Sequence, residues 1–466
     1  MIFAFPMIGL FLATIYFAFI GVKVTVEKHH DDQSMDFVRD ILKYAALFLS
    51  VFFLSFGLAG LLVQLIDPNN VAGLTDEDTA RALSFVIVGI PVVAVISRWI
   101  KRDFTKNLEN SFAPAWQIYL FASTTFTFLI WFLFLSGSLT WLAGEQYNPK
   151  GLAQGVISFI IWLIHIRLIA HHRSFTVNLH RFVGWFTGIT GSVVATISLL
   201  DYAISKSSGF IMSRFQIQEA VILLAIAAPT ALHYWNDFNL NVSANEQRIF
   251  RILGGLVIPA LFATIAATYT INQLITWFFG DHLDDVKIVL NDVPSTLATA
   301  FVLALVMIYF SNLLKHNSNF EWDDISRAQH YLLSAMAMVG LAISVGALIA
   351  GVLDTTDHQD ATIFGISLLV TTLPTWIINW RKCQIAVAME FESEHTSPIR
   401  RFYLYALIGV PTIIALGASV FVLFTFFKAL LIGGLDRIQL STPLGILIST
   451  GAVALYHLRI YRLENS

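Results

Sequence analysis

Residues 400–430 have the sequence RRFYLYALIGVPTIIALGASVFVLFTFFKAL, and residues 442–459 have the sequence TPLGILISTGAVALYHLR. Both are long apolar stretches, and an α-helix needs about 20 such residues to cross a hydrocarbon layer of about 30 Å. A short segment joins the two stretches, so they form a candidate transmembrane hairpin. The same pattern of helix, turn and helix recurs along the chain.

The composition of the whole chain is typical of a membrane protein. Of its 466 residues, 56% are hydrophobic and only 13% are charged, and the mean hydropathy is +0.71. Soluble domains contain about 45–50% apolar residues, and the strands of a membrane barrel would be shorter and would alternate in polarity. The chain is therefore predicted to be all-α, a polytopic transmembrane helical bundle.

A short motif of polar, aromatic and basic residues closes the second helix of each hairpin. The motifs are Ser97-Arg98-Trp99, His165-Ile166-Arg167, His233-Tyr234-Trp235, Asn312-Leu313-Leu314-Lys315, Asn379-Trp380-Arg381 and His457-Leu458-Arg459. Their first residues lie 68, 68, 79, 67 and 78 positions apart. A period of this kind is the mark of a repeat architecture.

The period predicts six tandem two-helix hairpins after one N-terminal helix, or about thirteen helices. The hairpins are predicted at 36–106, 107–173, 174–240, 241–318, 319–385 and 386–466, after an N-terminal helix and basic linker at 1–35. The helices are predicted at 2–22, 45–66, 82–99, 115–142, 152–170, 182–204, 217–235, 249–279, 293–314, 329–353, 361–380, 400–430 and 442–458.

Charge patterning predicts the orientation of the hairpins in the membrane. The linkers between hairpins, the segment after the first helix and the C-terminal tail hold 21 of the 28 Lys and Arg residues. Because positive charge is retained on the cytoplasmic side, these segments and the C-terminus are predicted to be cytoplasmic and the N-terminus to be outside. The expected location is a cytoplasmic (inner) membrane of the bacterial type.

Local signals predict helix starts and close helix packing. Thr75 with Asp78 forms a capping box, and Thr442 with Pro443 suggests an N-cap followed by a first-turn proline. Small residues at four-residue spacing, such as Gly184 with Gly188 and Gly340 with Ser344, should let neighbouring helices approach closely.

The last hairpin carries features that resemble a known family. These are Arg400-Arg401-Phe402-Tyr403-Leu404-Tyr405 with Gly409, then Gly433-Gly434, Thr442-Pro443-Leu444 and Leu455-Tyr456-His457-Leu458-Arg459. They resemble the bacterial multi-pass membrane family catalogued as domain of unknown function 5671, over about 400–460, and the other five units resemble progressively weaker copies. The resemblance implies tandem helical hairpins and carries no activity with it.

Three histidines of the closing motifs, His165, His233 and His457, are weak candidates for cofactor ligands. Imidazoles can bind haem iron or the magnesium of a chlorophyll-type pigment. Each of these histidines, however, lies at a helix end beside Arg or Trp, where an amphipathic side chain anchors at the headgroup level. Anchoring is the favoured interpretation, no cofactor or metal is predicted, and a haem or chlorophyll-type pigment stays open as an alternative.

Two further sets of residues are candidates for a path through the membrane. Prolines inside helices free backbone carbonyls and kink the helix, and they are Pro91, Pro229, Pro259, Pro374 and Pro411. Hydroxyls and amides at mid-membrane depth can line a pore or bind helices together, and they are Thr124, Thr127, Asn272, Gln273, Thr371 and Thr372.

The sequence contains no recognised catalytic motif and no loop long enough for a soluble catalytic domain, so the protein is not predicted to be an enzyme. The leading hypothesis is a non-catalytic scaffold or accessory subunit of a membrane complex, or a protein that binds lipid or pigment. A transporter or channel for a neutral or apolar solute is the alternative. The expected partners are the lipid bilayer and either other membrane subunits or the protein itself. A net charge of −3 without a long basic stripe gives no reason to expect nucleic acid.

Overall fold

The computed structural model describes residues 32–67, 75–106, 113–144, 146–170, 174–208, 217–279, 292–316, 324–353, 358–389, 391–432 and 437–464. None of these residues lies in a strand. The predicted N-terminal helix at 2–22 lies outside the described residues.

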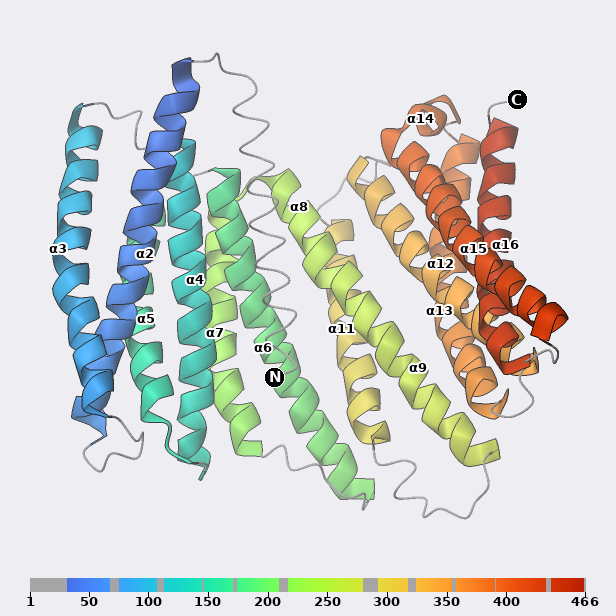
Figure 1. Ribbon diagram of the computed structural model, residues 1–466, viewed down its shortest axis with the longest axis horizontal. Coiled ribbons are helices and arrows are strands. Elements are labelled where there is room, and N and C mark those ends of the chain that lie inside the picture. The colour runs from blue at the N-terminus through green and yellow to red at the C-terminus, as the bar shows by residue number, and fades with distance from the viewer. Residues whose placement is uncertain are drawn as a thin grey trace. The chain divides into compact units, whose positions relative to one another are not determined.

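Helices account for nearly all of the described chain (Figure 1). The first half contains α2 (Asp32–Ile66), α3 (Asp76–Lys106), α4 (Pro114–Ser138), the 3₁₀ turn η2 (Leu139–Ala143), α5 (Pro149–Ile169), α6 (Phe175–Ser208) and α7 (Ile217–Asn241). The second half contains α8 (Ala244–Ile252), the π-helical turn η3 (Leu253–Val257), α9 (Ile258–Phe279), α11 (Val293–His316), α12 (Asp324–Leu353), α13 (His358–Met389), α14 (Phe391–Thr396), α15 (Pro398–Ile432) and α16 (Arg437–Glu464).

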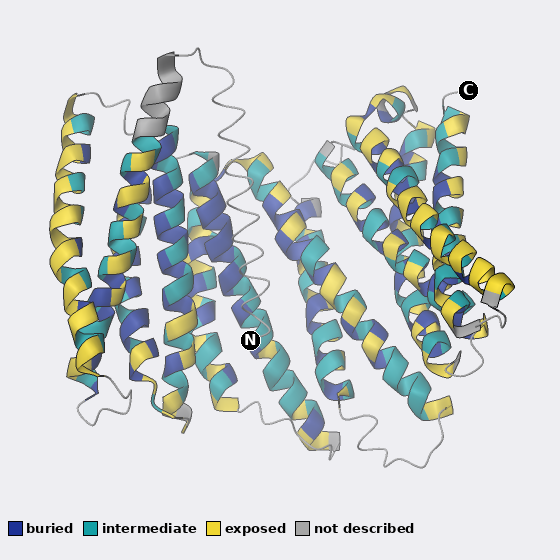
Figure 2. Cartoon of the chain, in the orientation of Figure 1, coloured by how far each residue is buried: buried dark blue, intermediate teal, exposed yellow. Residues whose placement is uncertain are grey.

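Twelve helical segments in the described part of the chain are long and apolar enough to cross a membrane. Large apolar side chains remain exposed along them, and Figure 2 shows in yellow where exposed residues lie on the helices. This outer surface requires an apolar surrounding, because soluble proteins rarely expose contiguous apolar patches of this extent. The predicted all-α polytopic membrane fold is confirmed.

The observed helices extend beyond most of the predicted ones. The helix predicted at 361–380 is α13, which continues to Met389, so the proposed repeat boundary after residue 385 falls inside a helix. The sequence criterion detected the apolar core of each span. The polar ends continue as helix because backbone hydrogen bonding does not stop where the apolar residues stop.

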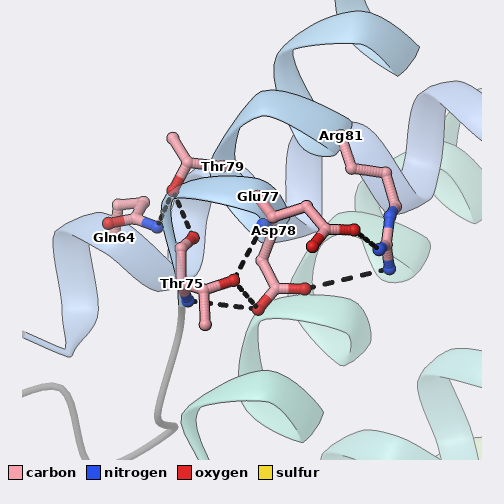
Figure 3. A network of polar contacts seen from close by, with 6 residues as sticks. All are labelled: Gln64, Thr75, Glu77, Asp78, Thr79 and Arg81. Atoms are coloured by element: carbon pink, nitrogen blue, oxygen red, sulfur yellow. Dashed lines mark hydrogen bonds and ion pairs between the residues drawn. The ribbon is translucent and has the colours of Figure 1, made fainter.

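The predicted capping box at the start of α3 is confirmed (Figure 3). The Thr75 hydroxyl accepts from the Asp78 backbone N–H at 3.2 Å, and the Asp78 carboxylate accepts from the Thr75 backbone N–H at 3.1 Å. The prediction for Thr442 and Pro443 is wrong, because α16 begins at Arg437 and contains Pro443 in its second turn. The polar residues before Thr442 continue the helix outward from the apolar span.

The proline positions are as the sequence suggested. Pro91, Pro229, Pro374 and Pro411 lie inside α3, α7, α13 and α15. Pro259 is the second residue of α9, which directly follows the π-helical turn η3. Because proline lacks the N–H of a regular helical bond, a widened turn at this point accommodates the interrupted ladder.

The chain divides into two compact units, each of which is described by itself. The first contains α2 to α5, α7 and the part of α6 up to Ala195. The second contains the rest of α6 and the helices from α8 to α16.

One four-helix arrangement occurs once in each unit. In the first unit, α2 packs against α3, α4 and α5, and α4 packs against α5. In the second unit, α12 packs against α13, α15 and α16, and α15 packs against α16. We call α2–α5 the first module and α12, α13, α15 and α16 the second module. In both, the first helix contacts the other three.

Small residues bring paired helices close together, as predicted. A Cβ atom added at Gly188 on α6 would lie 2.5 Å from the Ala231 backbone nitrogen on α7, and one added at Gly340 on α12 would lie 2.4 Å from the Thr372 side chain on α13. Ser344 also donates to the Gly365 carbonyl of α13 at 2.8 Å. These contacts replace the hydrophobic effect, which does not drive association between helices within lipid.

Candidate functional site

Two tyrosines and a histidine meet near one end of the first module. Tyr44 is on α2, Tyr119 is on α4 and His165 is on α5, and all three side chains are buried. The Tyr119 hydroxyl lies 3.0 Å from His165 Nε2, and the centroids of the two tyrosine rings are 6.1 Å apart. The cluster therefore joins three of the four helices of the module.

The second module repeats this cluster with Tyr331 on α12, Tyr403 on α15 and His457 on α16. The Tyr403 hydroxyl lies 3.5 Å from His457 Nε2, and the Tyr331 and Tyr403 rings are 5.0 Å apart. Ser334 Oγ lies a further 3.0 Å from the Tyr403 hydroxyl. The same residue types occupy the same helices of both modules.

The backbone determines which ring nitrogen of each histidine carries the proton. His165 Nδ1 lies 2.9 Å from the Ile161 carbonyl oxygen, and His457 Nδ1 lies 2.8 Å from the Val453 carbonyl oxygen. A carbonyl oxygen only accepts, so Nδ1 donates in both cases and neutral Nε2 accepts from tyrosine. Both ring nitrogens are therefore occupied, and the buried imidazole is fully hydrogen-bonded.

The first unit contains another tyrosine–histidine pair, in which the histidine is on the first helix of the hairpin and the tyrosine is on the second. His180 is on α6 and Tyr234 is on α7, and the Tyr234 hydroxyl lies 2.9 Å from His180 Nε2. Trp162 of α5 donates to the Tyr234 hydroxyl at 3.1 Å, and Thr125 of α4 lies 2.9 Å from His180 Nδ1. This network joins the second hairpin of the first module to the hairpin that follows it.

The second module has a network of buried charges beside its tyrosines. Arg400 of α15 binds Glu464 of α16 through two nitrogens and donates to the Tyr331 hydroxyl at 2.5 Å. Tyr331 donates to Glu394 of α14 at 3.2 Å, and Arg327 of α12 also binds Glu394. Arg400 is 1% exposed and Glu394 is 0% exposed. We call these five residues the charge network.

The first module places an aromatic residue where the second has Arg400. Trp116 lies three residues before Tyr119, as Arg400 lies three residues before Tyr403. The Trp116 ring stacks on Tyr119 with the ring centroids 5.1 Å apart, and it contacts Tyr44 at 5.3 Å. The first module therefore has a stacked ring where the second has a buried arginine. The charged group of the first module at this end is Lys43, beside Tyr44, and it binds Asp40 and Asp103 at 3.0 Å each.

The comparison with known families matches the two modules. The family described as Domain of unknown function (DUF5671) matches residues 40–164 and 327–452, which together make up more than half of the chain. The chain belongs to this family. No curated protein and no solved structure gave a match.

Each segment that matches DUF5671 covers the four long helices of one module, so the family unit spans two of the predicted hairpins. The resemblance noted over about 400–460 extends back to residue 327, and a second copy lies at 40–164. Both segments contain the first two members of the tyrosine–tyrosine–histidine cluster. The two histidines lie just beyond the matched ends, at 165 and 457.

The predicted histidine candidates fall into two groups. His165 and His457 are buried and hydrogen-bonded, so their interpretation as headgroup anchors is wrong. His233 is exposed, and for it anchoring stays a prediction. A cofactor metal at His165 or His457 would have to displace the tyrosine hydroxyl from Nε2. In the described part of the chain, no group of three His, Cys, Asp or Glu residues is arranged to hold a metal ion.

The predicted polar residues at mid-membrane depth are mostly bonded within their own helices. Thr124, Thr127 and Thr372 donate to backbone carbonyls three or four residues earlier. Thr371 of α13 lies 2.8 Å from Thr268 of α9, hydroxyl to hydroxyl, and so joins two helices of the second unit.

Asn272 and Gln273 of α9 are half-buried. Within the described residues, the Gln273 Oε1 atom is buried and has no hydrogen-bond partner. Thr124 and Thr127 belong to the first unit, whereas Thr371, Thr372 and the two amides belong to the second. The six residues therefore do not form one set within a single unit.

Tyr119, Trp116, Glu394 and Glu464 were missed by sequence reasoning. A repeated pattern could have revealed the tyrosines, because Pro114 and Pro398 each precede a Tyr-Leu pair by five residues. The sequence indicated the roles of Glu394 and Glu464 less clearly. Both carboxylates lie on the side where the charge count is basic, and only the structure shows that they neutralise buried arginines.

Tyr119→Phe should destabilise the first module by about 1–3 kcal/mol, because it removes the donor to His165 Nε2 and leaves a buried acceptor unpaired. The matched control is Tyr405→Phe, because Tyr405 is exposed on α15. Unfolding of the purified protein in mild detergent measures the difference. Equal effects of the two substitutions would show that the buried pair contributes nothing.

Glu394→Gln should destabilise the second module by about 3 kcal/mol or more, because it removes the buried carboxylate that Arg327 and Tyr331 bind. Glu392→Gln is the control, since Glu392 lies on the same short helix and is exposed. We expect the first variant alone to unfold at lower temperature and to be cleaved faster by protease within α14. The same cleavage rate in both variants would contradict this role of the charge network.

Proposed function

We propose that this DUF5671 protein is a non-catalytic integral membrane protein that acts as a scaffold or accessory subunit, or binds lipid, through the outer faces of its helices. The observation that carries the proposal is the distribution of polarity. The buried tyrosines, histidines and arginines of the two modules bind one another, whereas large apolar side chains cover the exposed faces. What the protein presents to its surroundings is apolar surface.

The tyrosine–histidine clusters support a structural role for the inner polar groups. Each histidine uses both ring nitrogens in hydrogen bonds to its own module, as a residue that stabilises packing does. A general base or a ligand needs a nitrogen directed at its substrate or metal. The duplicated clusters therefore favour stable modules that hold their outer faces in place.

A path for a neutral solute is the second candidate, and Gln273 is the observation that favours it. An unpaired amide oxygen buried in a membrane helix is costly, and the same helix carries Thr268, whose hydroxyl lies 2.8 Å from that of Thr371 on α13. Loss of solute uptake into proteoliposomes after Gln273→Leu would support this candidate. A haem or chlorophyll-type pigment, the third hypothesis, would give the purified protein visible absorption.

The proposed role predicts a specific companion in the native membrane. After gentle solubilisation and affinity purification, we expect mass spectrometry to find either another membrane subunit in near-stoichiometric amount or one lipid class enriched over its share of the membrane. An unrelated polytopic protein purified from the same membrane is the control. A chain that purifies alone, with lipids in the proportions of the bulk membrane, would overturn the proposal.

We also propose that the linkers between hairpins face the cytoplasm. The structure offers exposed positions at both ends of the helices, with Glu77 and Asp360 in the first turns of α3 and α13 and Lys106 and Arg462 on the linker side. In a Cys383→Ser background, an impermeant maleimide should label cysteines at the first two positions in intact cells. The last two should be labelled only after permeabilisation. Opposite behaviour of Lys106→Cys and Arg462→Cys would refute the orientation.

A further inference from the structure

Consecutive hairpins of the chain contact each other through one recurring pair of helices. In the first unit, α4 packs against α7, and the Phe128 and Tyr234 rings are 5.3 Å apart. In the second unit, α9 packs against α13, and Thr268 meets Thr371. In both cases the first helix of one hairpin contacts the second helix of the next hairpin.

The helix prolines show that α3, α7 and α13 are rotated in the same way. Two residues before Pro91, Pro229 and Pro374 stand Gly89, Ala227 and Thr372. Each of these three residues faces the first helix of its own hairpin, against Leu54, Gly191 and Gly340 respectively. The helices therefore present equivalent faces, and positions counted from the proline can be compared between them.

In α13, the residue one position further from the proline contacts the preceding hairpin. This residue is Thr371, which meets Thr268. The equivalent residue in α3 is Val88, and it is 64% exposed. Of the twelve spans, α3 has the smallest buried share of its apolar window, 11%. Within the described residues, no hairpin precedes α3 to cover this face.

The complementary face on α15 is exposed as well. Thr268 lies nine residues after Pro259, and Val420 lies nine residues after Pro411. Val420 is 65% exposed. Counted from Tyr119 and Tyr403, the buried Phe132 of α4 corresponds to Leu416 of α15, which is 62% exposed. An alanine Cβ at Gly417 beside it would meet no atom within 4 Å.

The two open faces also lie at the same distance from the turn ends of their helices. Val88 is 12 residues from the start of α3 at its turn end, and Val420 is 12 residues from the end of α15 at its turn end. Thr371 and Thr268, which do meet, are 13 and 11 residues from the corresponding ends of α13 and α9. No charged residue lies between Arg401 and Lys428 of α15, so its open face is apolar along this stretch.

We propose that α15 of one copy of this protein packs against α3 of a second copy, repeating between chains the contact that α4 makes with α7 and α9 makes with α13. The contact is head-to-tail, because two different surfaces of the chain meet. It lies within the bilayer, where close packing at small residues such as Gly417 drives helix association. This property is separate from the binding of a different subunit or lipid.

Cross-linking between differently tagged chains tests the contact. In a Cys383→Ser background, a chain with Val88→Cys and a chain with Val420→Cys are co-expressed and treated in native membranes with a short bifunctional thiol reagent. The matched control replaces the second chain by one with Ile448→Cys. Ile448 is an exposed residue of α16 that lies 11 residues from the turn end of its helix.

We expect a dimer carrying both tags from the Val88→Cys and Val420→Cys pair and loss of this product in the control pair. The untagged wild-type chain in nanodiscs should have the mass of two or more 52.0 kDa chains. A monomeric mass, equal cross-linking in both pairs, or products only from two identical cysteine positions would overturn the proposal. A cross-link to a different protein alone would overturn it too and would leave the scaffold role intact.

Discussion

Every polar group within the hydrocarbon layer must find its partner inside the protein, because lipid offers none. This constraint organises the described structure at two levels. Along each helix, hydroxyls such as those of Thr124 and Ser367 donate to carbonyls of the preceding turn. Between helices, tyrosine and histidine complete one another's hydrogen bonds. A helix pair that satisfies its polar atoms in this way can expose only apolar side chains.

The tyrosine–histidine contact is suited to this constraint for a chemical reason. The i−4 carbonyl holds the histidine Nδ1 proton, so Nε2 is left as an acceptor that only a hydroxyl or an N–H can satisfy. A tyrosine on the neighbouring helix supplies that donor at the end of a rigid apolar ring. The contact therefore specifies both the spacing and the rotation of two helices. Its presence in both family modules is consistent with a role in defining the module.

The residues next to the tyrosine–histidine contact differ between the two modules. Against Tyr119 the first module stacks Trp116, whereas against Tyr331 the second module places Arg400 with Glu464 and Glu394. A buried ion pair adds little net stability over well-packed apolar groups, but the loss of one partner is costly. The charge network thus binds α14 and the end of α16 to the module only while all five of its residues are present. Stacked rings impose no such condition.

The sequence by itself determined the helical class, the apolar core of each span, the positions of the helix prolines and the family. These properties depend on local composition and on the fixed length of a membrane helix, which are visible in one dimension. The capping box of Thr75 and Asp78 was predictable for the same reason, since its partners are three residues apart. The helix ends were less so, because polar residues such as those before Thr442 continue a helix without any apolar signal.

Only the tertiary structure decided which polar residues meet. His165 and His233 occupy the same place in their motifs, yet one is buried against Tyr119 and the other is exposed. Nothing local distinguishes them, because burial depends on which neighbouring helix covers that face. Helix packing likewise determines that Arg400 pairs with Glu464, and that Val88 is exposed whereas Thr371 is partly buried. Periodicity specifies which residues share a face of a helix, and packing alone specifies what that face contacts.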